Sequence, residues 1–273
     1  MTNKVIMVVA DGLRYETAIT QMGYINHLVE KGKAARCLVQ SELPSLSRPL
    51  YEVLLTGIPA WKNGIASNQA VRLSGQKSLF HLVKEQGMRN AAAAYYWVSE
   101  LYNRAPFDYV ADRHQADPEK AIQYGSFYFA DPYPDSHLLI DGEALRRTHD
   151  PHFLYIHPMG IDHVGHLYGS DSKQYRGKAI ELDTLLANFL PLWMEAGYSI
   201  VITADHGMNR DGQHGGTGID ERQVPLYAIG ETVRPGIYEE MIPQLAVAPL
   251  ICQLLGIEPS GEMISYEWPF LHS

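Results

Sequence analysis

The chain has 273 residues, a formal net charge of -9 and a sequence pI of about 5.7. Its 46% hydrophobic and 19% charged residues are typical of an ordered globular protein, and its length suffices for a large core. The negative charge argues against general attraction to nucleic acid polymers or to anionic membrane surfaces. We therefore expect residues 1–273 to form a single domain with a small-molecule partner.

Targeting and membrane signals are weak in this sequence. The first apolar run ends at Asp11 after a few residues, which is too short for a signal peptide. No segment approaches the 18 or so uninterrupted apolar residues of a membrane span. The two cysteines, Cys37 and Cys252, do not form a CxxC pair. These features favour a cytoplasmic location without a membrane segment.

Strand-like and helix-like segments alternate along the chain, which predicts an α/β fold with a mostly parallel sheet. In chain order, strands are expected at 4–10, 35–41, 91–97, 152–158, 198–204 and 224–230. Helices are expected at 15–31, 47–56, 77–86, 173–194 and 242–255. The stretch 103–150 is weakly periodic, and it is expected either as a small cap over a site or as a long surface connection.

Polar residues follow four of the predicted strands. Along the chain they are Asp11, then Ser47 within "PSLSRP", then Asp162 and His166, and finally Asp205, His206 and His214. Because ligands of parallel sheets bind outside the carboxyl ends of the strands, we expect these residues to meet at one edge. Taken singly, an Asp or a Ser at such a point is most often a helix cap, and a His is most often a loop residue.

Three Asp and three His at one edge form a nitrogen and oxygen ligand set that suits zinc, and manganese less strongly. Six ligands are too many for one tetrahedral ion with an open position. They suit two divalent ions that share a substrate, as in phosphoryl transfer. Asp162 and His166 are four residues apart and would share one helical face.

On these residues the chain resembles the alkaline phosphatase superfamily, and most of all its nucleotide pyrophosphatase/phosphodiesterase (type I phosphodiesterase) branch. The matching segments are 8–14, 44–68, 160–169, 203–208, 212–216, 224–230 and 248–257, in family order. The resemblance implies a three-layer α/β/α sandwich with a mostly parallel central sheet.

The resemblance also implies roles for single residues. One metal ion is expected on Asp11, Asp205, His206 and the nucleophile, and the other on Asp162, His166 and His214. Ser47 is the implied nucleophile because Pro49, Thr56 and Gly57 follow it at the family spacing, which excludes Ser45. Asn68 falls where the family uses an Asn side chain to donate to a phosphoryl oxygen.

The chain departs from the nucleotide-cleaving pattern in ways that put a nucleotide substrate in doubt. Arg48 replaces an apolar residue that helps to hold the base. It is expected either as a solvated side chain or as a ligand of a second anionic group of the substrate. His214 follows His206 by eight positions, the compact form of ethanolamine-phosphate transferases rather than the long insertion of nucleotide pyrophosphatases.

Several nearby residues are expected outside the ligand set. His157 and His163 are predicted to have structural or supporting roles, and Asp211 is predicted to lie in a turn. Tyr95, Tyr96 and Trp97 end a predicted strand and are expected in the core rather than in a substrate platform.

We therefore expect a two-metal phosphoric ester hydrolase of the phosphodiesterase or nucleotide pyrophosphatase type. Metal-bound Ser47 would attack phosphorus and form a phosphoseryl intermediate, aided by amides and the dipole at a helix N-terminus.

A phosphomonoesterase or phosphonate hydrolase of the same superfamily is the alternative. A sulfatase is less expected because Tyr51 stands at the Arg of its motif. A phosphomutase would need an inserted domain between Asn68 and Asp162, and a catalytically silent metal protein would be expected to have lost a ligand.

Overall fold

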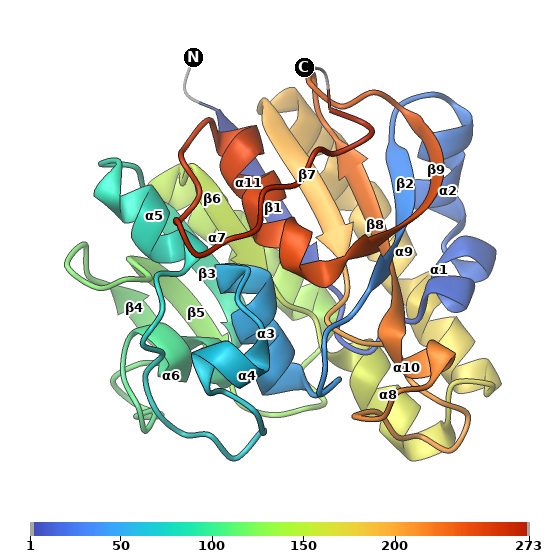
Figure 1. Ribbon diagram of the computed structural model, residues 1–273, viewed down its shortest axis with the longest axis horizontal. Coiled ribbons are helices and arrows are strands. Elements are labelled where there is room, and N and C mark those ends of the chain that lie inside the picture. Colours follow the sequence, from blue (N-terminus) through green and yellow to red (C-terminus); the bar gives the residue numbers. More distant parts are fainter. Residues whose placement is uncertain (1–2, 272–273) are drawn as a thin grey trace.

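A nine-stranded sheet forms the centre of the protein in this computed structural model, which describes residues 3–271 (Figure 1). The strand order is β4-β5-β3-β6-β1-β7-β8-β2-β9. The strands are β1 (Lys4–Val9), β2 (Ala35–Gln40), β3 (Asn90–Tyr95), β4 (His114–Ala116), β5 (Tyr124–Tyr128), β6 (Phe153–Ile156), β7 (Tyr198–Thr203), β8 (Gln223–Ile229) and β9 (Gly236–Pro243). Most strand pairs are parallel, and the antiparallel pairs are β4 with β5 and β8 with both β7 and β2.

Helices cover both faces of this sheet. They are α1 (Tyr15–Gln21), α2 (Gly23–Glu30), α3 (Ser47–Thr56), α4 (Ala60–Asn63), α5 (Leu79–Glu85), α6 (Tyr96–Tyr102), α7 (Asp135–His149), α8 (Gly160–Tyr168), α9 (Lys173–Glu195), α10 (Ile219–Arg222) and α11 (Val247–Leu255). Helices α3, α5 and α11 pack together on one face, and α1, α2, α7 and α9 pack together on the other. Figure 1 shows the first group in front of the sheet. The predicted α/β sandwich with a mostly parallel central sheet is therefore confirmed.

The strand β1 lies between β6 and β7 at the centre of the sheet. Residues Val5–Val9 of β1 are fully buried, as expected for a strand covered on both faces. β3 is instead built on four alanines, Ala91–Ala94, although alanine is uncommon in strands. Gly142 of α7 faces Ala93 and Ile156, and an added Cβ there would come within 2.8 Å of the Ile156 side chain. Small residues on both elements thus let α7 approach the sheet closely.

Several element boundaries differ from the predictions. The expected helix 15–31 is broken at Met22, and α2 begins anew because Asp183 of α9 accepts hydrogen bonds from the amides of Tyr24 and Ile25. The expected helix 242–255 begins only at Val247, because residues up to Pro243 form β9 at the edge of the sheet. The remaining predicted helices agree with α3, α5 and α9 within two residues.

The segment 103–150 is not a separate cap, which corrects that expectation. It supplies β4 and β5 to the sheet, and α7 packs across β3, β5 and β6. Parts of it also contact residues around the candidate site: the Tyr128 hydroxyl donates to the His157 carbonyl at 2.8 Å, and Asp131 in the turn after β5 accepts from the Tyr95 hydroxyl at 3.0 Å. The weak sequence periodicity reflects short strands with small or polar residues rather than an excursion from the sheet.

Candidate metal and nucleophile site

The first group of predicted ligands meets at the carboxyl ends of β1 and β7, near the lower edge of the sheet in Figure 1. The Nε2 atom of His206 lies 3.4 Å from Oδ1 of Asp11 and 3.3 Å from Oδ2 of Asp205. The Ser47 hydroxyl, at the start of α3, lies 3.0 Å from the same Nε2. All four side chains are buried, and the three ligand atoms of Asp11, Asp205 and His206 lie close enough to hold one cation.

The second group lies beside the first. Nε2 of His214 is 3.7 Å from Oδ1 of Asp162 and 3.2 Å from Nε2 of His166, and Nε2 of His166 is 3.4 Å from Oδ2 of Asp162. The rings of His206 and His214 stack with centroids 3.7 Å apart, which joins the two groups. Asp162 and His166 share one face of α8, as their spacing predicted. All six predicted ligands therefore converge, on segments that follow β1, β6 and β7.

The three histidines present the same ring nitrogen to the site. Nδ1 of His166 bonds the Gly212 carbonyl, Nδ1 of His214 bonds the Ser45 carbonyl, and Nδ1 of His206 bonds the Gly207 carbonyl, at 2.8–2.9 Å. A carbonyl only accepts, so each Nδ1 carries the proton and each Nε2 keeps a free lone pair. This is the tautomer of a metal-binding histidine whose other nitrogen is held by a backbone acceptor.

Three carboxylate oxygens of the site are buried without a hydrogen-bond partner among residues 3–271. They are Oδ1 of Asp11, Oδ1 of Asp162 and Oδ2 of Asp205. Burial, followed by repulsion from Asp11, raises the pKa of Asp162 and of Asp205 well above their ordinary values. Burial, followed by the proximity of the His214 ring, lowers the pKa of His206 to about 3. Neutral imidazoles and crowded, unpaired carboxylates fit divalent cations, because a bound cation would satisfy all of them at once.

Ser47 and Asn68 lie together at the start of α3. The Asn68 Oδ1 atom accepts the backbone N–H of Arg48 at 3.0 Å, so the amide NH₂ of Asn68 is free to donate. The expected cluster of helix N-terminal amides is not available, because Arg48 is bonded to Asn68, Pro49 has no N–H, and the Leu50 amide bonds Leu46. The helix thus contributes its dipole and at most the amide of Ser47.

Ser45, the other serine of the motif, holds the loop at 214–216. Its hydroxyl donates to the Gly216 carbonyl at 2.7 Å and accepts the Gly215 amide at 3.1 Å. Its carbonyl accepts from His214. The geometry therefore agrees with the preference for Ser47 over Ser45 as the reactive hydroxyl.

Arg48 is not solvated, which corrects one of its two expected roles; the role of an anion ligand stays a prediction. The residue is 1% exposed, and its guanidinium forms an ion pair with Glu100 at 2.7 Å. The same group lies 4.6 Å from the centroid of the Trp97 ring. Trp97 and Tyr96 are half-buried against the core, and Tyr95 is buried, as expected.

Tyr51 and His157 both contact Asp11, and these contacts were not predicted from the sequence. Oδ2 of Asp11 accepts a short hydrogen bond from the Tyr51 hydroxyl and lies 3.1 Å from Nε2 of His157. His157 is fully buried, which is consistent with a supporting role. Tyr51 stands four residues after Ser47, so helical spacing places both on one face of α3. That spacing is the sequence signal that could have identified it.

Two other predicted residues lie outside the ligand groups. Asp211 is exposed in the turn at 209–212, and its amide donates to Asn209. His163 is half-buried on α8.

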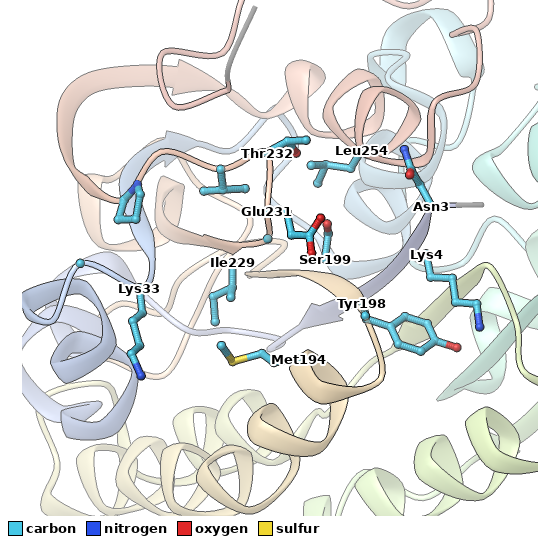
Figure 2. A pocket seen from close by; sticks show the side chains of 15 residues that line it. Asn3, Lys4, Lys33, Met194, Tyr198, Ser199, Ile229, Glu231, Thr232 and Leu254 are labelled. Atoms are coloured by element: carbon cyan, nitrogen blue, oxygen red, sulfur yellow. The ribbon is translucent and has the colours of Figure 1, made fainter. Parts of the chain in front are cut away.

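A pocket of about 480 Å³ lies at the opposite edge of the sheet, at the amino ends of β1 and β7. Met194, Ile229 and Leu254 give it apolar walls, and Lys4 and Lys33 lie on opposite sides of it (Figure 2). None of the predicted site residues lines this pocket. Within residues 3–271, no helix combines the length and apolar character that crossing a bilayer requires.

Comparison with known proteins identifies relatives in sequence and in fold. The human GPI ethanolamine phosphate transferase 2, catalytic subunit, is 24% identical over 93% of this chain. The chain spans about a quarter (26%) of the length of that relative. The structure of murine ectonucleotide pyrophosphatase/phosphodiesterase 5 superposes with a TM-score of 0.77 at 12% identity, covering 96% of this chain and 98% of the other. An inactive variant of that protein in complex with AMP gives the same TM-score at 13% identity, covering 96% and 97%.

The likeness to solved structures is one of fold, because the identity is low. The family itself is shown by its profile, "Type I phosphodiesterase / nucleotide pyrophosphatase", which matches residues 5–214 and thereby includes every residue of the converging site. With that match over most of its length, the chain belongs to the type I phosphodiesterase/nucleotide pyrophosphatase family.

Proposed function

We propose that this protein cleaves phosphoric esters, preferentially diesters, with Ser47 as the nucleophile. The observation that carries the proposal is the Ser47 hydroxyl 3.0 Å from Nε2 of His206, beside three buried carboxylate oxygens that lack a partner among residues 3–271. A hydroxyl in that position is surrounded by ligand atoms for cations, which is what a poor nucleophile needs.

The proposed ligands are Asp11, Asp205, His206 and Ser47 for one divalent cation and Asp162, His166 and His214 for the other, with zinc favoured over manganese. When bound, such cations lower the pKa of a coordinated hydroxyl and neutralise charge on the phosphoryl group. Ser47 Oγ would form a bond to phosphorus as the bond to the leaving ester oxygen breaks, and the Ser47 proton would end on that oxygen to give the free alcohol. The Asn68 NH₂ would donate to a phosphoryl oxygen. Water would then hydrolyse the phosphoseryl ester, which releases the phosphate product and restores the Ser47 hydroxyl.

A second candidate function is transfer of the phosphoryl group to an alcohol instead of water. It is favoured by the ethanolamine phosphate transferase that aligns with 93% of the chain and by the compact loop between His206 and His214. A phosphodiester of ethanolamine would then be the donor. Hydrolysis and transfer share the step at Ser47 and differ only in the second acceptor.

Release of p-nitrophenol from bis-p-nitrophenyl phosphate, p-nitrophenyl phosphate and p-nitrophenyl sulfate tests the proposal. We expect the diester to be cleaved fastest, the sulfate slowest, and all turnover to stop when a chelator removes the metal. Ser47→Ala should lower kcat by a factor on the order of 10³ or more, as loss of a nucleophile does. Ser45→Ala, which removes a neighbouring hydroxyl with structural bonds only, should lower it by about tenfold or less.

Phosphorus NMR of the same reaction in the presence of glycerol separates the two candidate functions. A glyceryl p-nitrophenyl diester would indicate transfer, and p-nitrophenyl phosphate alone would indicate hydrolysis. Chelator-resistant turnover, or full activity of Ser47→Ala, would contradict both.

A further inference from the structure

Arg48 occupies an unusual place for a charged residue, directly after the proposed nucleophile and out of solvent. Its guanidinium donates to Oε2 of Glu100 at 2.7 Å and to the carbonyl of Ala70 at 3.2 Å. The Cζ atom of the group lies over the Trp97 ring, 4.6 Å from its centroid. Glu100 is itself only 3% exposed, and its second oxygen accepts the Phe107 amide at 2.9 Å. The ion pair is therefore fixed from both sides.

The same residue holds the segment at 68–70 in two places. The backbone N–H of Arg48 is bonded to the Asn68 side chain, and the Arg48 guanidinium is bonded to the Ala70 carbonyl two residues later. Because an N–H group bonds only to an acceptor, the Arg48 amide must face the Asn68 oxygen. The NH₂ end of the Asn68 side chain therefore points away from the Arg48 amide. The segment around Asn68 is otherwise exposed or half-buried, with Ala66 and Gln69 exposed to solvent. Both bonds from Arg48 therefore hold this segment against α3.

We infer that Arg48 is a positioning residue for Asn68. Locked between Glu100 and Trp97, its guanidinium holds the 68–70 segment against the start of α3 and keeps the Asn68 amide beside Ser47. The inference rests on the proposed function, because it assigns Asn68 a task in phosphoryl transfer. It is an alternative to the role of an anion ligand, and the burial of the guanidinium and its ion pair with Glu100 favour it.

Lysine is a poor substitute in this position. A guanidinium is planar, so it can stack on Trp97 while two of its nitrogens donate in different directions to Glu100 and Ala70. An ammonium is a compact point charge that keeps the pairing with Glu100 but cannot reproduce the flat fork. Arg48→Lys therefore removes the link to Ala70 and leaves the buried charge compensated, which favours a folded variant.

A double-mutant cycle between Arg48→Lys and Asn68→Ala tests the inference on bis-p-nitrophenyl phosphate. If Arg48 acts through Asn68, Arg48→Lys lowers kcat by about tenfold or more while KM changes by less than about threefold. The loss should shrink to about twofold or less when Asn68 is already Ala. The loss should also be equal for the diester and for dianionic p-nitrophenyl phosphate. Glu100→Gln, which keeps the shape of the pair, should give a smaller loss with the same dependence on Asn68.

Arg146→Lys is the matched control, because Arg146 also forms an ion pair with a mostly buried glutamate, Glu143, but on α7 and away from the site. It should leave kcat at the wild-type value. Equal losses from Arg48→Lys with and without Asn68 would overturn the inference. So would a rise in KM confined to the dianionic substrate, which indicates direct contact with the anion.

Hydrogen exchange of the amides at 66–72 gives a measure that does not depend on turnover. Exchange should be faster in Arg48→Lys than in the wild type and unchanged in Arg146→Lys. If the wild-type protein hydrolysed none of the substrates, the proposed function would fail, but faster exchange would still support the clamp on Asn68. Unchanged exchange in Arg48→Lys would overturn the clamp, whatever the activity.

Discussion

The two oxygens of the Asp11 carboxylate have different environments. Oδ2 is bonded by Tyr51 and faces His157, whereas Oδ1 has no partner among residues 3–271 and points to His206. Burial raises the pKa of Asp11, but the His157 hydrogen bond, the neighbouring imidazoles of His206 and His157 and the Tyr51 hydrogen bond together outweigh it and lower the pKa below its ordinary value. Asp11 is therefore ionised, with one oxygen held by the protein and the other left for a cation.

Replacing Tyr51 by Phe tests the importance of that orientation. The ring would keep its contacts with Trp97 and His157, and only the bond to Asp11 would be lost. Because partners of metal ligands orient them, we expect zinc affinity to fall by about 10- to 100-fold, measured by titration calorimetry. Tyr155→Phe is the control, since the Tyr155 hydroxyl is equally buried but has no partner among residues 3–271. Equal zinc affinity for wild type and Tyr51→Phe would show that the bond does not orient Asp11.

The positions of single residues could be predicted where a ligand-type side chain directly follows a recognisable strand. Asp11 and Asp205 follow buried strands directly, so their place at the sheet edge could be predicted from the sequence. The burial of Arg48 could not, because its partner Glu100 lies 52 residues away and looks like any surface glutamate. The hydrogen bond from Tyr51 to Asp11 could not be predicted either, because it depends on how α3 packs against β1 and local sequence patterns do not determine that packing.

At the scale of single elements, the loop between His206 and His214 is held by a network of hydrogen bonds in addition to the buried side chain of Met208. Oδ1 of Asn209 accepts the amides of Asp211 and Gln213, and Glu221 of α10 receives the side-chain amide of Asn209 and the backbone amide of Gly216. A Cβ on Gly207 would clash with the Asp220 carbonyl, so α10 closes directly onto this glycine. These contacts explain how two histidines eight positions apart can stack.

Helix α7 is held by a charge cluster rather than by a continuous apolar stripe. Glu143 accepts from Arg146 and Arg147 on α7 and from the Trp193 indole of α9. Burial raises the pKa of Glu143, but the hydrogen bonds from Arg146, Arg147 and Trp193 outweigh it and lower the pKa from 4.5 to about 2. This long-range pairing explains why a segment with weak periodicity still forms a helix against the sheet.

The lowered pKa of Glu143 predicts a pH-dependent contribution to stability. Because the folded-state pKa lies below the unfolded value, the stabilisation is present above pH 4.5 and is lost as the pH falls towards 2. Glu143→Gln should therefore lower the free energy of unfolding by about 2 kcal/mol at pH 7. Urea unfolding between pH 7 and pH 3.5 should show this difference shrinking with acidity, whereas Glu195→Gln, exposed on α9, should differ little from wild type throughout. A difference independent of pH would exclude the ionised form as its source.

Over the whole molecule, the sheet order brings the ligands together. β6, β1 and β7 are neighbours in the sheet, and they precede Asp162, Asp11 and Asp205 respectively. Ser47 arrives from β2, on the far side of β8, through the connection at 41–46. Residues that are far apart in sequence thus meet only when the parallel sheet is complete, so metal binding and folding should be coupled.

The global arrangement could be predicted only in part. The parallel centre follows from apolar strands alternating with helices, but the direction of β8 could not be predicted because an apolar strand pattern is the same in both directions. β9 has a partly exposed, acidic sequence, "GIYEEMIP", which suits an edge strand that must resist pairing with another chain. Edge strands such as β4 and β9 lack the burial that makes central strands recognisable in sequence.

Metal binding should stabilise the whole molecule. Replacing one metal ligand should distinguish the cost of repulsion among the carboxylates from the stabilisation that a bound metal provides. At a concentration one hundred times its dissociation constant, zinc should add about 2.7 kcal/mol per site, which raises Tm by roughly 5–10 °C in scanning calorimetry.

Asp205→Asn removes a carboxylate that is crowded against Asp11 and Asp162. The metal-free variant should therefore be as stable as the metal-free wild type or more stable, while the gain from zinc should fall by about half or more. Asp211→Asn, which changes an exposed carboxylate of the same loop, should keep the full gain. If zinc stabilised Asp205→Asn as much as wild type, or if neither zinc nor manganese raised Tm, the carboxylates at this edge would not form a metal site.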